Sequence, residues 1–331
     1  MKSFQIKIVI YSPNWIGDAV MALPFIQNIK DDHPKAEIHI ICKEWVKDIY
    51  KNHKEVTGLI SLSNSDLKGV HNILAVGKLL KSKNFDLSYT LTESFRSAFI
   101  LWLSNIHIRI GFNTQWRKYF LTRPVNLPTK LIHRSDKYVK LIDEKLRYEA
   151  MPKFYLSENE KVWAKRRMKR IGFRKPTAIF PFSVGADRTL SYGNIKKWIK
   201  GSSKDYLIFG SNKDSNKAKA LINRCNNNSI KEICGKFTLR ESISLIALCE
   251  SSIATDSGLG HISAALGIPT LSFFGKGNFL ETSPLGTKTK VIKHCSPCRG
   301  SKCRSNEKGR LCIKKISKKD VEVAVNHLID K

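Results

Sequence analysis

Short β-like segments alternate with longer helix-like segments through the first half of the chain, and this alternation is the strongest constraint on the fold. Strands are expected at Ile6 to Tyr11, Ala36 to Cys42, Leu59 to Leu62 and Asp86 to Leu91. Apolar residues at helical spacing predict helices at Ala19 to Lys30, Leu67 to Lys81 and Ser94 to Leu103. Strands separated by helices of this length are typical of βαβ units with a parallel sheet.

The same alternation returns in the second half, after a helix that joins the two halves. Ser157 and Glu160 form a capping box, and the helix they open should run through a basic block to Gly172. Further strands are expected at Thr177 to Phe182, Tyr206 to Phe209, Ile230 to Ile233, Ser252 to Thr255 and Thr270 to Phe274. A chain of 331 residues accommodates two domains of ordinary size. We therefore predict an α/β protein with two doubly wound, Rossmann-like domains, residues 1–155 and 156–331.

Composition excludes several classes of protein. Hydrophobic residues make up 42% of the chain, which excludes intrinsic disorder. No apolar run approaches the ~18 to 20 residues that span a bilayer, and no signal-peptide cleavage site is present, so we expect a cytoplasmic protein. The formal net charge of +30 favours polyanionic partners such as nucleic acid, anionic lipid headgroups or phosphorylated substrates. A solvated, lysine-rich surface is the alternative interpretation of this charge.

The first segment suited to chemistry follows the first predicted strand and reads Asn14-Trp15-Ile16-Gly17-Asp18. Ligands of open α/β sheets bind outside the carboxyl ends of the strands. Asp18 stands there at the start of a helix, where its carboxylate could act as a general base for a substrate hydroxyl. A helix-capping role is the alternative.

Two segments of the second half are suited to binding an anion. Thr255-Asp256-Ser257-Gly258-Leu259-Gly260-His261 joins a strand to a helix, whose N-terminal N–H groups attract phosphate. Ser183 and Arg188 lie in a loop after another strand, and an arginine can grip phosphate with two donors. A capped helix and an ordinary surface loop are the respective alternatives.

The cysteines fall into two groups. Four are clustered as Cys295-x2-Cys298-x4-Cys303-x8-Cys312. Four thiolates at short spacing could hold a structural Zn²⁺, although reduced thiols or an adventitious disulfide explain the cluster as well. The scattered cysteines are expected to be buried thiols: Cys42, Cys225, Cys234 and Cys249.

These segments together resemble the ADP-heptose:lipopolysaccharide heptosyltransferases, inverting enzymes with the two-domain GT-B fold. The resemblance runs from Ile8 to about Val325. It rests on the Asn14 to Asp18 segment, on Thr255 to His261 with the following Ala264 to Thr270, and on the clustered cysteines. The Asn-Trp-x-Gly-Asp form is more similar to the second heptosyltransferase of the pathway than to the first.

The resemblance implies that the two domains face a central cleft, the N-terminal one binding the acceptor and the C-terminal one the ADP-sugar. It makes Asp18 the catalytic base of a metal-independent reaction that requires no cofactor. It implies ADP-heptose contacts from Ser183, Arg188, Asp214, Phe237, Asp256, Ser257, Gly258 and His261. Arg188 stands where most members have Lys. Candidate acceptor contacts are Asn14, Trp15, Gly17, Arg117, Lys118 and Arg123.

The expected function is therefore transfer of heptose from ADP-heptose to the lipopolysaccharide inner core. The heptose added is expected to be the second one of the core. Because the acceptor is a lipid, we expect the enzyme to act at the inner face of the inner membrane, in peripheral contact with its anionic surface. No nucleic-acid partner is expected. A related transferase for another sugar is one alternative. A non-catalytic, zinc-containing RNA-binding protein is another, although the sequence has no RNP motif.

Overall fold

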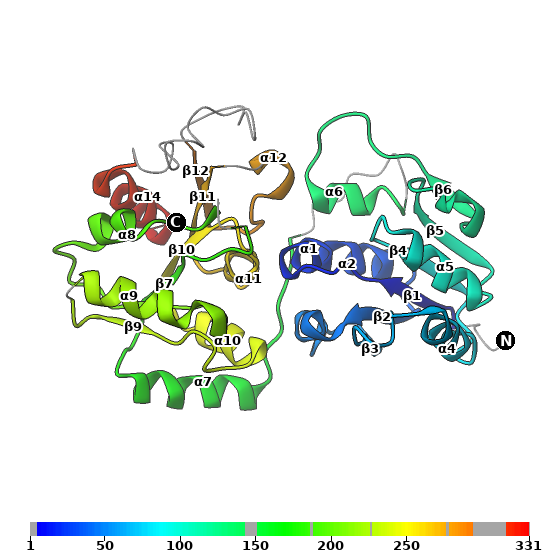
Figure 1. Ribbon diagram of the computed structural model, residues 1–331, viewed down its shortest axis with the longest axis horizontal. Coiled ribbons are helices and arrows are strands. Elements are labelled where there is room, and N and C mark those ends of the chain that lie inside the picture. The colour runs from blue at the N-terminus through cyan, green and yellow to red at the C-terminus, as the bar shows by residue number, and fades with distance from the viewer. Residues whose placement is uncertain are drawn as a thin grey trace. The chain divides into compact units, whose positions relative to one another are not determined.

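The computed structural model describes residues 5–142, 151–185, 188–225, 227–275, 278–293 and 316–330. The chain divides into two compact units between Tyr155 and Leu156. Each unit is built on a parallel sheet of six strands with helices packed against it (Figure 1). This confirms the predicted α/β class with two doubly wound, Rossmann-like domains. Within the described ranges, no helix has both the length and the apolar character needed to cross a bilayer.

The sheet of the first unit has the strand order β3-β2-β1-β4-β5-β6. Its strands are β1 (Lys7–Tyr11), β2 (Glu37–Lys43), β3 (Gly58–Leu62), β4 (Leu87–Thr90), β5 (Ile108–Phe112) and β6 (Arg123–Val125). Its helices are α1 (Ile16–Met21), α2 (Leu23–Asp32), η1 (Glu44–Val46), α3 (Lys47–Tyr50), α4 (Val70–Lys81), α5 (Phe95–Leu103), η2 (Arg117–Phe120) and α6 (Arg134–Val139). The central strand β1 is apolar and almost wholly buried because helices cover both faces of a parallel sheet.

The structure differs from the sequence-based expectation in this unit at one predicted helix and at two strands, and it adds the short helices α3, η2 and α6. The helix expected from Ala19 to Lys30 is two helices, α1 and α2, which meet at Ala22. Pro24 lies in the first turn of α2, where a residue without an N–H is tolerated. The strands β5 and β6 were not predicted, because polar residues such as Arg109 and Arg123 obscure their pattern.

The sheet of the second unit has the strand order β12-β11-β10-β7-β8-β9. Its strands are β7 (Thr177–Phe180), β8 (Tyr206–Ile208), β9 (Ile230–Glu232), β10 (Ser251–Thr255), β11 (Thr270–Phe274) and β12 (Thr289–Lys293). Its helices are α7 (Glu158–Ile171), α8 (Tyr192–Ile199), η4 (Asn212–Asp214), α9 (Ser215–Cys225), α10 (Leu239–Ile246), α11 (Gly258–Ala265), α12 (Phe279–Thr282) and α14 (Lys318–Asp330).

The helix α7 begins and ends where its sequence predicts. The Glu160 N–H donates to the Ser157 hydroxyl at 3.3 Å, and the Ser157 N–H donates to the Glu160 carboxylate at 2.8 Å. Gly172 ends the helix in the left-handed region, with φ of +85°. Both ends of this helix are therefore determined by local residues.

Both sheets have the same topology, and it determines where a ligand can bind. In the first unit the strand order reverses between β1 and β4, and in the second between β7 and β10. Loops at the carboxyl ends of two such strands separate and leave a crevice, which is the usual ligand site of open α/β sheets. Asp18, in the first turn of α1 after β1, and Asp256, in the loop after β10, lie at these two positions.

Candidate active site

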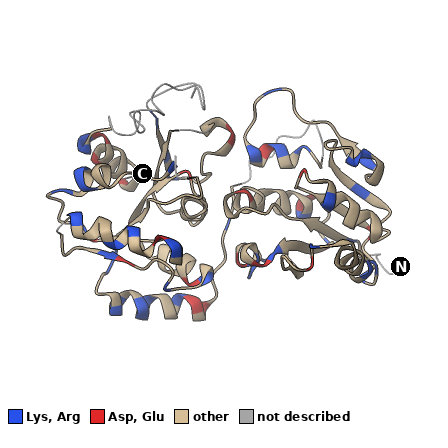
Figure 2. Ribbon diagram, viewed as in Figure 1, with Lys and Arg blue, Asp and Glu red and all other residues tan. Residues whose placement is uncertain are grey.

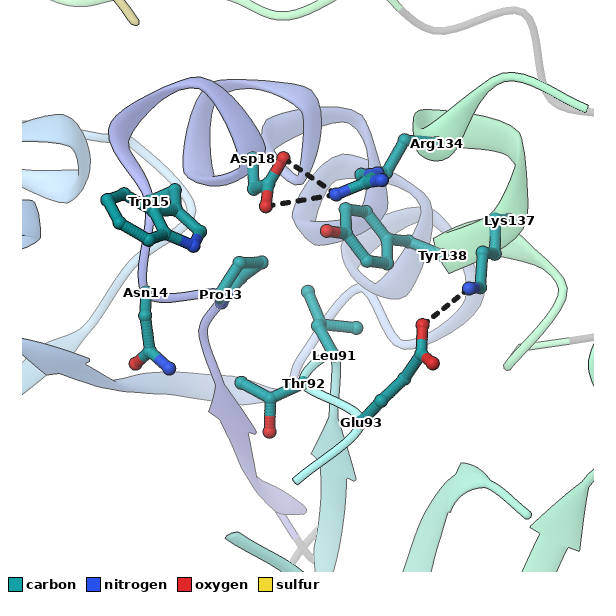
Figure 3. A pocket seen from close by; sticks show the side chains of 10 residues that line it. All are labelled: Pro13, Asn14, Trp15, Asp18, Leu91, Thr92, Glu93, Arg134, Lys137 and Tyr138. Atoms are coloured by element: carbon teal, nitrogen blue, oxygen red, sulfur yellow. Dashed lines mark hydrogen bonds and ion pairs between the residues drawn. The ribbon is translucent and has the colours of Figure 1, made fainter. Parts of the chain in front are cut away.

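A pocket of about 170 Å³ lies at the switch point of the first unit (Figure 3). The loop after β1, the loop after β4 and the helix α6 form its wall. The lining residues are Pro13, Asn14, Trp15, Asp18, Leu91, Thr92, Glu93, Arg134, Lys137 and Tyr138. The pocket thus includes three of the residues singled out from the sequence: Asn14, Trp15 and Asp18.

Asp18 lies on the pocket wall with 18% of its side chain exposed. A single nitrogen of Arg134, Nη1, donates to both carboxylate oxygens at 3.1 Å (Figure 3). The N-cap residue of α1 is Trp15, so the capping alternative for Asp18 does not describe its position. The ion pair holds a carboxylate beside a space that a substrate hydroxyl could enter.

The rest of the pocket wall is polar and includes a second ion pair. Lys137 Nζ lies 2.5 Å from a Glu93 carboxylate oxygen and joins α6 to the loop after β4. Tyr138 lines the same pocket, and burial, reinforced by the nearby Asp18 carboxylate, raises the pKa of Tyr138 well above its ordinary value. Its phenol therefore stays protonated at neutral pH and can donate a hydrogen bond.

The other predicted acceptor contacts lie at different positions. Gly17 is part of α1 and half-buried, and it is not among the residues that line the pocket. Lys118 on η2 and Arg123 on β6 are exposed and also lie outside the lining. Trp15 is 62% exposed at the rim.

Arg117 is completely buried. Its Nη1 donates to the carbonyl of Thr92 and, at 3.3 Å, to that of Ser94. Burial lowers the pKa of Arg117 to about 10, so it remains charged at neutral pH. In this position the side chain supports the pocket wall at Thr92 from behind, and a direct acceptor contact would require it to leave these carbonyls.

An arginine and an aspartate also meet at the switch point of the second unit. Arg188 Nη1 donates to a carboxylate oxygen of Asp256 at 2.8 Å, and the Asp256 side chain is only 11% exposed. The Ser183 hydroxyl donates to the Asp256 backbone carbonyl at 3.2 Å. The structure therefore brings together three predicted donor contacts from the loops after β7 and β10.

The helix α11 begins directly beside this ion pair. Its N-cap residue Ser257 has an extended backbone, and the buried Ser257 hydroxyl has no hydrogen-bond partner among the described residues. Gly258 is the first helical residue and His261, in the first turn, is 3% exposed. A Cβ on Gly260 would lie 2.9 Å from the Ala254 side chain, so only glycine allows this close packing of α11 on β10.

Asp214 and Phe237 lie on the neighbouring loops after β8 and β9. The Asp214 carboxylate caps η4 by accepting from the Ser211 hydroxyl at 2.6 Å. The ring of Phe237 packs against α7, with the Arg167 guanidinium 4.8 Å from its centroid. The two loops touch through Gly235, where φ is +68° and a Cβ would lie 2.4 Å from the Asn212 Cα.

The clustered cysteines of the zinc hypothesis, Cys295, Cys298, Cys303 and Cys312, lie outside the described residues. Within the residues that are described, no group of His, Cys, Asp and Glu could hold a metal ion. Three scattered cysteines are buried thiols as predicted: Cys42, Cys234 and Cys249. Cys225 is half-buried.

The model of glycosyltransferase family 9 (heptosyltransferase) matches residues 73–308, which is more than half of the chain. The chain belongs to this glycosyltransferase family. It is therefore an enzyme, and the resemblance stated from its motifs is confirmed.

Individual members of the family match along most of the chain. Lipopolysaccharide heptosyltransferase 2 of Salmonella typhimurium is 25% identical over 317 residues, which cover 87% of this chain and 88% of the relative. Lipooligosaccharide heptosyltransferase 2 of Campylobacter jejuni serotype O:2 is 27% identical, with 97% and 98% covered. Among solved structures, the E. coli ADP-heptose lps heptosyltransferase II has a TM-score of 0.86 at 22% identity, with 98% of both chains covered. This chain therefore has the GT-B fold.

Sequence reasoning missed the part of the pocket that α6 supplies. Arg134, Lys137 and Tyr138 occupy positions i, i+3 and i+4 of this helix and so lie on one face of it. That spacing is visible in the sequence and could have marked a polar helix face. Nothing local shows that this face meets a loop 116 residues earlier in the chain.

Proposed function

We propose that this family 9 glycosyltransferase transfers heptose from ADP-heptose to the inner core of lipopolysaccharide and adds the second heptose. The observation that carries the proposal is the Asp18 carboxylate on the wall of the first unit's switch-point pocket. The choice of the second heptose is supported by the relatives from Salmonella and Campylobacter, both named heptosyltransferase 2. The donor is supported by the similar E. coli structure, which is that of an ADP-heptose heptosyltransferase.

In the proposed reaction Asp18 is the general base. It accepts the proton of an acceptor heptose hydroxyl, whose oxygen attacks the anomeric carbon of the donor as the bond from that carbon to the diphosphate breaks. ADP departs with the bonding electron pair, and the anomeric configuration inverts. Arg134 holds the carboxylate in place, Asn14 and Trp15 line the acceptor side, and Gly17 lies beside them in α1. Lys118 and Arg123, both exposed, are proposed to meet acidic groups farther along the acceptor, and Arg117 to support the wall.

We assign the donor to the second unit. Arg188, the Ser257 hydroxyl and the first N–H groups of α11 offer positive charge and donors to a diphosphate. The loops after β7 and β10 and the first turn of α11 form this site, with Ser183, Asp256, Gly258 and His261 among their residues. Asp214 and Phe237 are proposed to contact the ribose and the adenine of the donor. Because Arg188 supplies the charge that stabilises departing ADP, transfer is expected to continue in the presence of EDTA. A structural zinc at Cys295, Cys298, Cys303 and Cys312 is a separate hypothesis, tested by the metal content of the purified protein.

The test is a transfer assay on defined acceptors. Purified protein is incubated with ADP-heptose and truncated lipopolysaccharide that carries either no heptose or one heptose, and products are identified by mass. Added mass of one heptose on the mono-heptosyl acceptor alone is the expected result. Transfer to the heptose-free acceptor would contradict the second-heptose assignment, and transfer from another ADP-sugar but not ADP-heptose would favour a related transferase. We further propose that the enzyme works at the cytoplasmic face of the inner membrane, where such an acceptor is presented.

A further inference from the structure

Exposed aromatic side chains gather on the first unit beside the Asp18 pocket. Trp116 is 78% exposed, Tyr119 67%, Trp102 46% and Phe95 44%. We call these four residues the aromatic patch. The ring of Phe120 joins its two helices, since its centroid lies 5.1 Å from that of Phe95 and 5.7 Å from that of Trp102. The Phe95 N–H donates to the Gln115 side chain at 3.2 Å, so the turn that carries Trp116 is tied to the same cluster.

The backbone at the centre of the patch is strained in a way that exposes a large ring. Gln115 and Trp116 both have left-handed conformations, with φ of 49° and 60°. Asn or Gly adopts this region at lower free energy than a bulky residue does. A tryptophan that is both unfavourable for the turn and mostly exposed contributes little to folding, which indicates that it serves an interaction outside the chain.

The sequence around the patch is positively charged without any acidic residue. Residues 94–135 contain no Asp or Glu and seven basic residues: Arg96, Arg109, Arg117, Lys118, Arg123, Lys130 and Arg134. Figure 2 shows Lys and Arg but no acidic residue on η2 and β6. Arg96, Lys118, Arg123 and Lys130 are exposed. Lys118 Nζ lies 5.2 Å from the centroid of the Tyr119 ring. Exposed Trp and Tyr flanked by exposed cations are typical of surfaces that lie in the headgroup region of an anionic bilayer.

Exposed aliphatic residues favour a bilayer over a nucleic acid as the occupant. Leu131 is 53% exposed and Leu127 39%, both in the segment that leads from β6 to α6. Bases stack on aromatic rings, but leucine side chains gain most from transfer into hydrocarbon. The mixture of Trp, Tyr, Leu and Lys therefore matches lipid better than RNA.

The patch is connected directly to the pocket. Thr114 donates to the Glu93 carbonyl at 3.1 Å, and buried Arg117 donates to the Thr92 carbonyl. Thr92 and Glu93 line the pocket that contains Asp18. A bilayer bound at the patch would therefore contact the segment that supports the pocket wall at Thr92 and Glu93.

We propose that the aromatic patch, with Leu127 and Leu131, docks the enzyme on an anionic phospholipid bilayer and so holds the Asp18 pocket close to the membrane surface. The docking surface is supported by the exposed rings, by the basic residues around them and by the left-handed backbone of Gln115 and Trp116. The statement that docking presents a lipid-linked acceptor to Asp18 rests on the proposed function.

The first experiment measures vesicle binding by the full chain. Co-sedimentation is compared for vesicles of phosphatidylcholine alone and of phosphatidylcholine with about one third phosphatidylglycerol, at low and high salt. Binding to the anionic vesicles that weakens with salt is expected. The double variant Trp116→Asn with Tyr119→Ser should bind about tenfold more weakly or worse, since two interfacial rings lose their burial. Val70→Ser is the matched control, because Val70 is 71% exposed on α4, and should bind like the wild type.

Equal binding to both vesicle types, or wild-type binding by the double variant, would overturn the proposal. So would binding of single-stranded RNA, or formation of a dimer, that depends on the patch in the absence of vesicle binding.

The second experiment separates docking from catalysis. Transfer is measured on a deacylated, water-soluble acceptor and on the same acceptor carried in anionic vesicles. The double variant should retain wild-type rate on the soluble acceptor and lose activity on the vesicles. Equal loss on both acceptors would show that the patch acts on the site itself and would overturn docking. If the wild type transfers nothing to either acceptor, the proposed function fails while vesicle binding still decides the docking surface.

Discussion

The two switch points of the molecule carry the same pair of residue types and hold it in different ways. In the first unit the carboxylate of Asp18 lines an open pocket, and its arginine comes from α6, far along the chain. In the second unit the carboxylate of Asp256 is nearly buried, and its arginine comes from the loop after the adjacent strand β7. One arrangement presents an anion to the pocket, and the other uses an anion to anchor a cation beside a helix N-terminus. Equivalent topology is therefore compatible with the two roles that we propose, proton acceptance at Asp18 and phosphate binding beside Asp256.

Exchange of each aspartate for asparagine is the strongest test of this difference. Asp18→Asn should lower kcat by ~10² to 10⁴-fold, the usual contribution of a general base, and leave ADP affinity unchanged. Asp256→Asn should change the KM for the donor more than kcat. Steady-state kinetics with calorimetric titration of ADP measure both. Turnover by Asp18→Asn at nearly the wild-type rate would contradict the proposal that Asp18, unlike Asp256, acts as the general base.

Removal of the arginine in the second unit should have the next largest effect. If Arg188 binds the diphosphate as proposed, Arg188→Ala removes charge-assisted hydrogen bonds to it, so the KM for the donor should rise by about 10 to 100-fold. Arg188→Lys keeps the charge and should recover most of the affinity. If Arg188→Ala and the wild type bind the donor equally well, the assignment of the diphosphate to the Arg188 loop is wrong.

We propose that Arg134 in the first unit positions the Asp18 carboxylate, so its loss should affect kcat. Loss of its two hydrogen bonds to Asp18 weakens the hold on the carboxylate, and we expect Arg134→Ala to lower kcat by about tenfold with donor KM unchanged. Because one Nη1 atom makes both contacts, Arg134→Lys can reproduce them and should restore much of the rate. A rise in donor KM without loss of kcat would assign Arg134 to binding instead.

A third arginine–carboxylate pair, away from both switch points, provides the contrast. Arg240 Nε donates to Glu160 at 2.5 Å, and Arg240 is buried. Burial of Glu160 alone would raise its pKa, but hydrogen bonds from Arg240 and Ser157 outweigh this and hold the pKa at about 2. Glu160→Gln should therefore lower the free energy of unfolding by roughly 1 to 3 kcal/mol and leave kcat unchanged.

The pH dependence of that loss checks its electrostatic origin. A carboxyl whose pKa is depressed in the folded state stabilises the fold above its ordinary value of 4.5, and this contribution is lost as the pH falls toward 2. Urea unfolding of the wild type and of Glu160→Gln should therefore converge on acidification. A difference that stays constant down to the lowest pH would contradict the ion pair as its cause.

Much of the fold could be predicted because it follows from local patterns. The capping box at Ser157, the strands β1 and β7 and the motif loops at Asp18 and Asp256 each depend on residues close together in the chain. The break at Ala22 and the polar strand β6 could not be predicted, because packing against the rest of the unit decides them.

The sequence by itself determined the family, the two Rossmann-like domains and the identity of the two motif aspartates. Tertiary structure alone decided which arginine pairs with each, why Arg117 is buried while Lys118 is exposed, and where the aromatic side chains of α5 and η2 gather. The physical reason is distance along the chain: caps and strand patterns are short-range, whereas ion pairs and surface clusters form only when remote segments pack together.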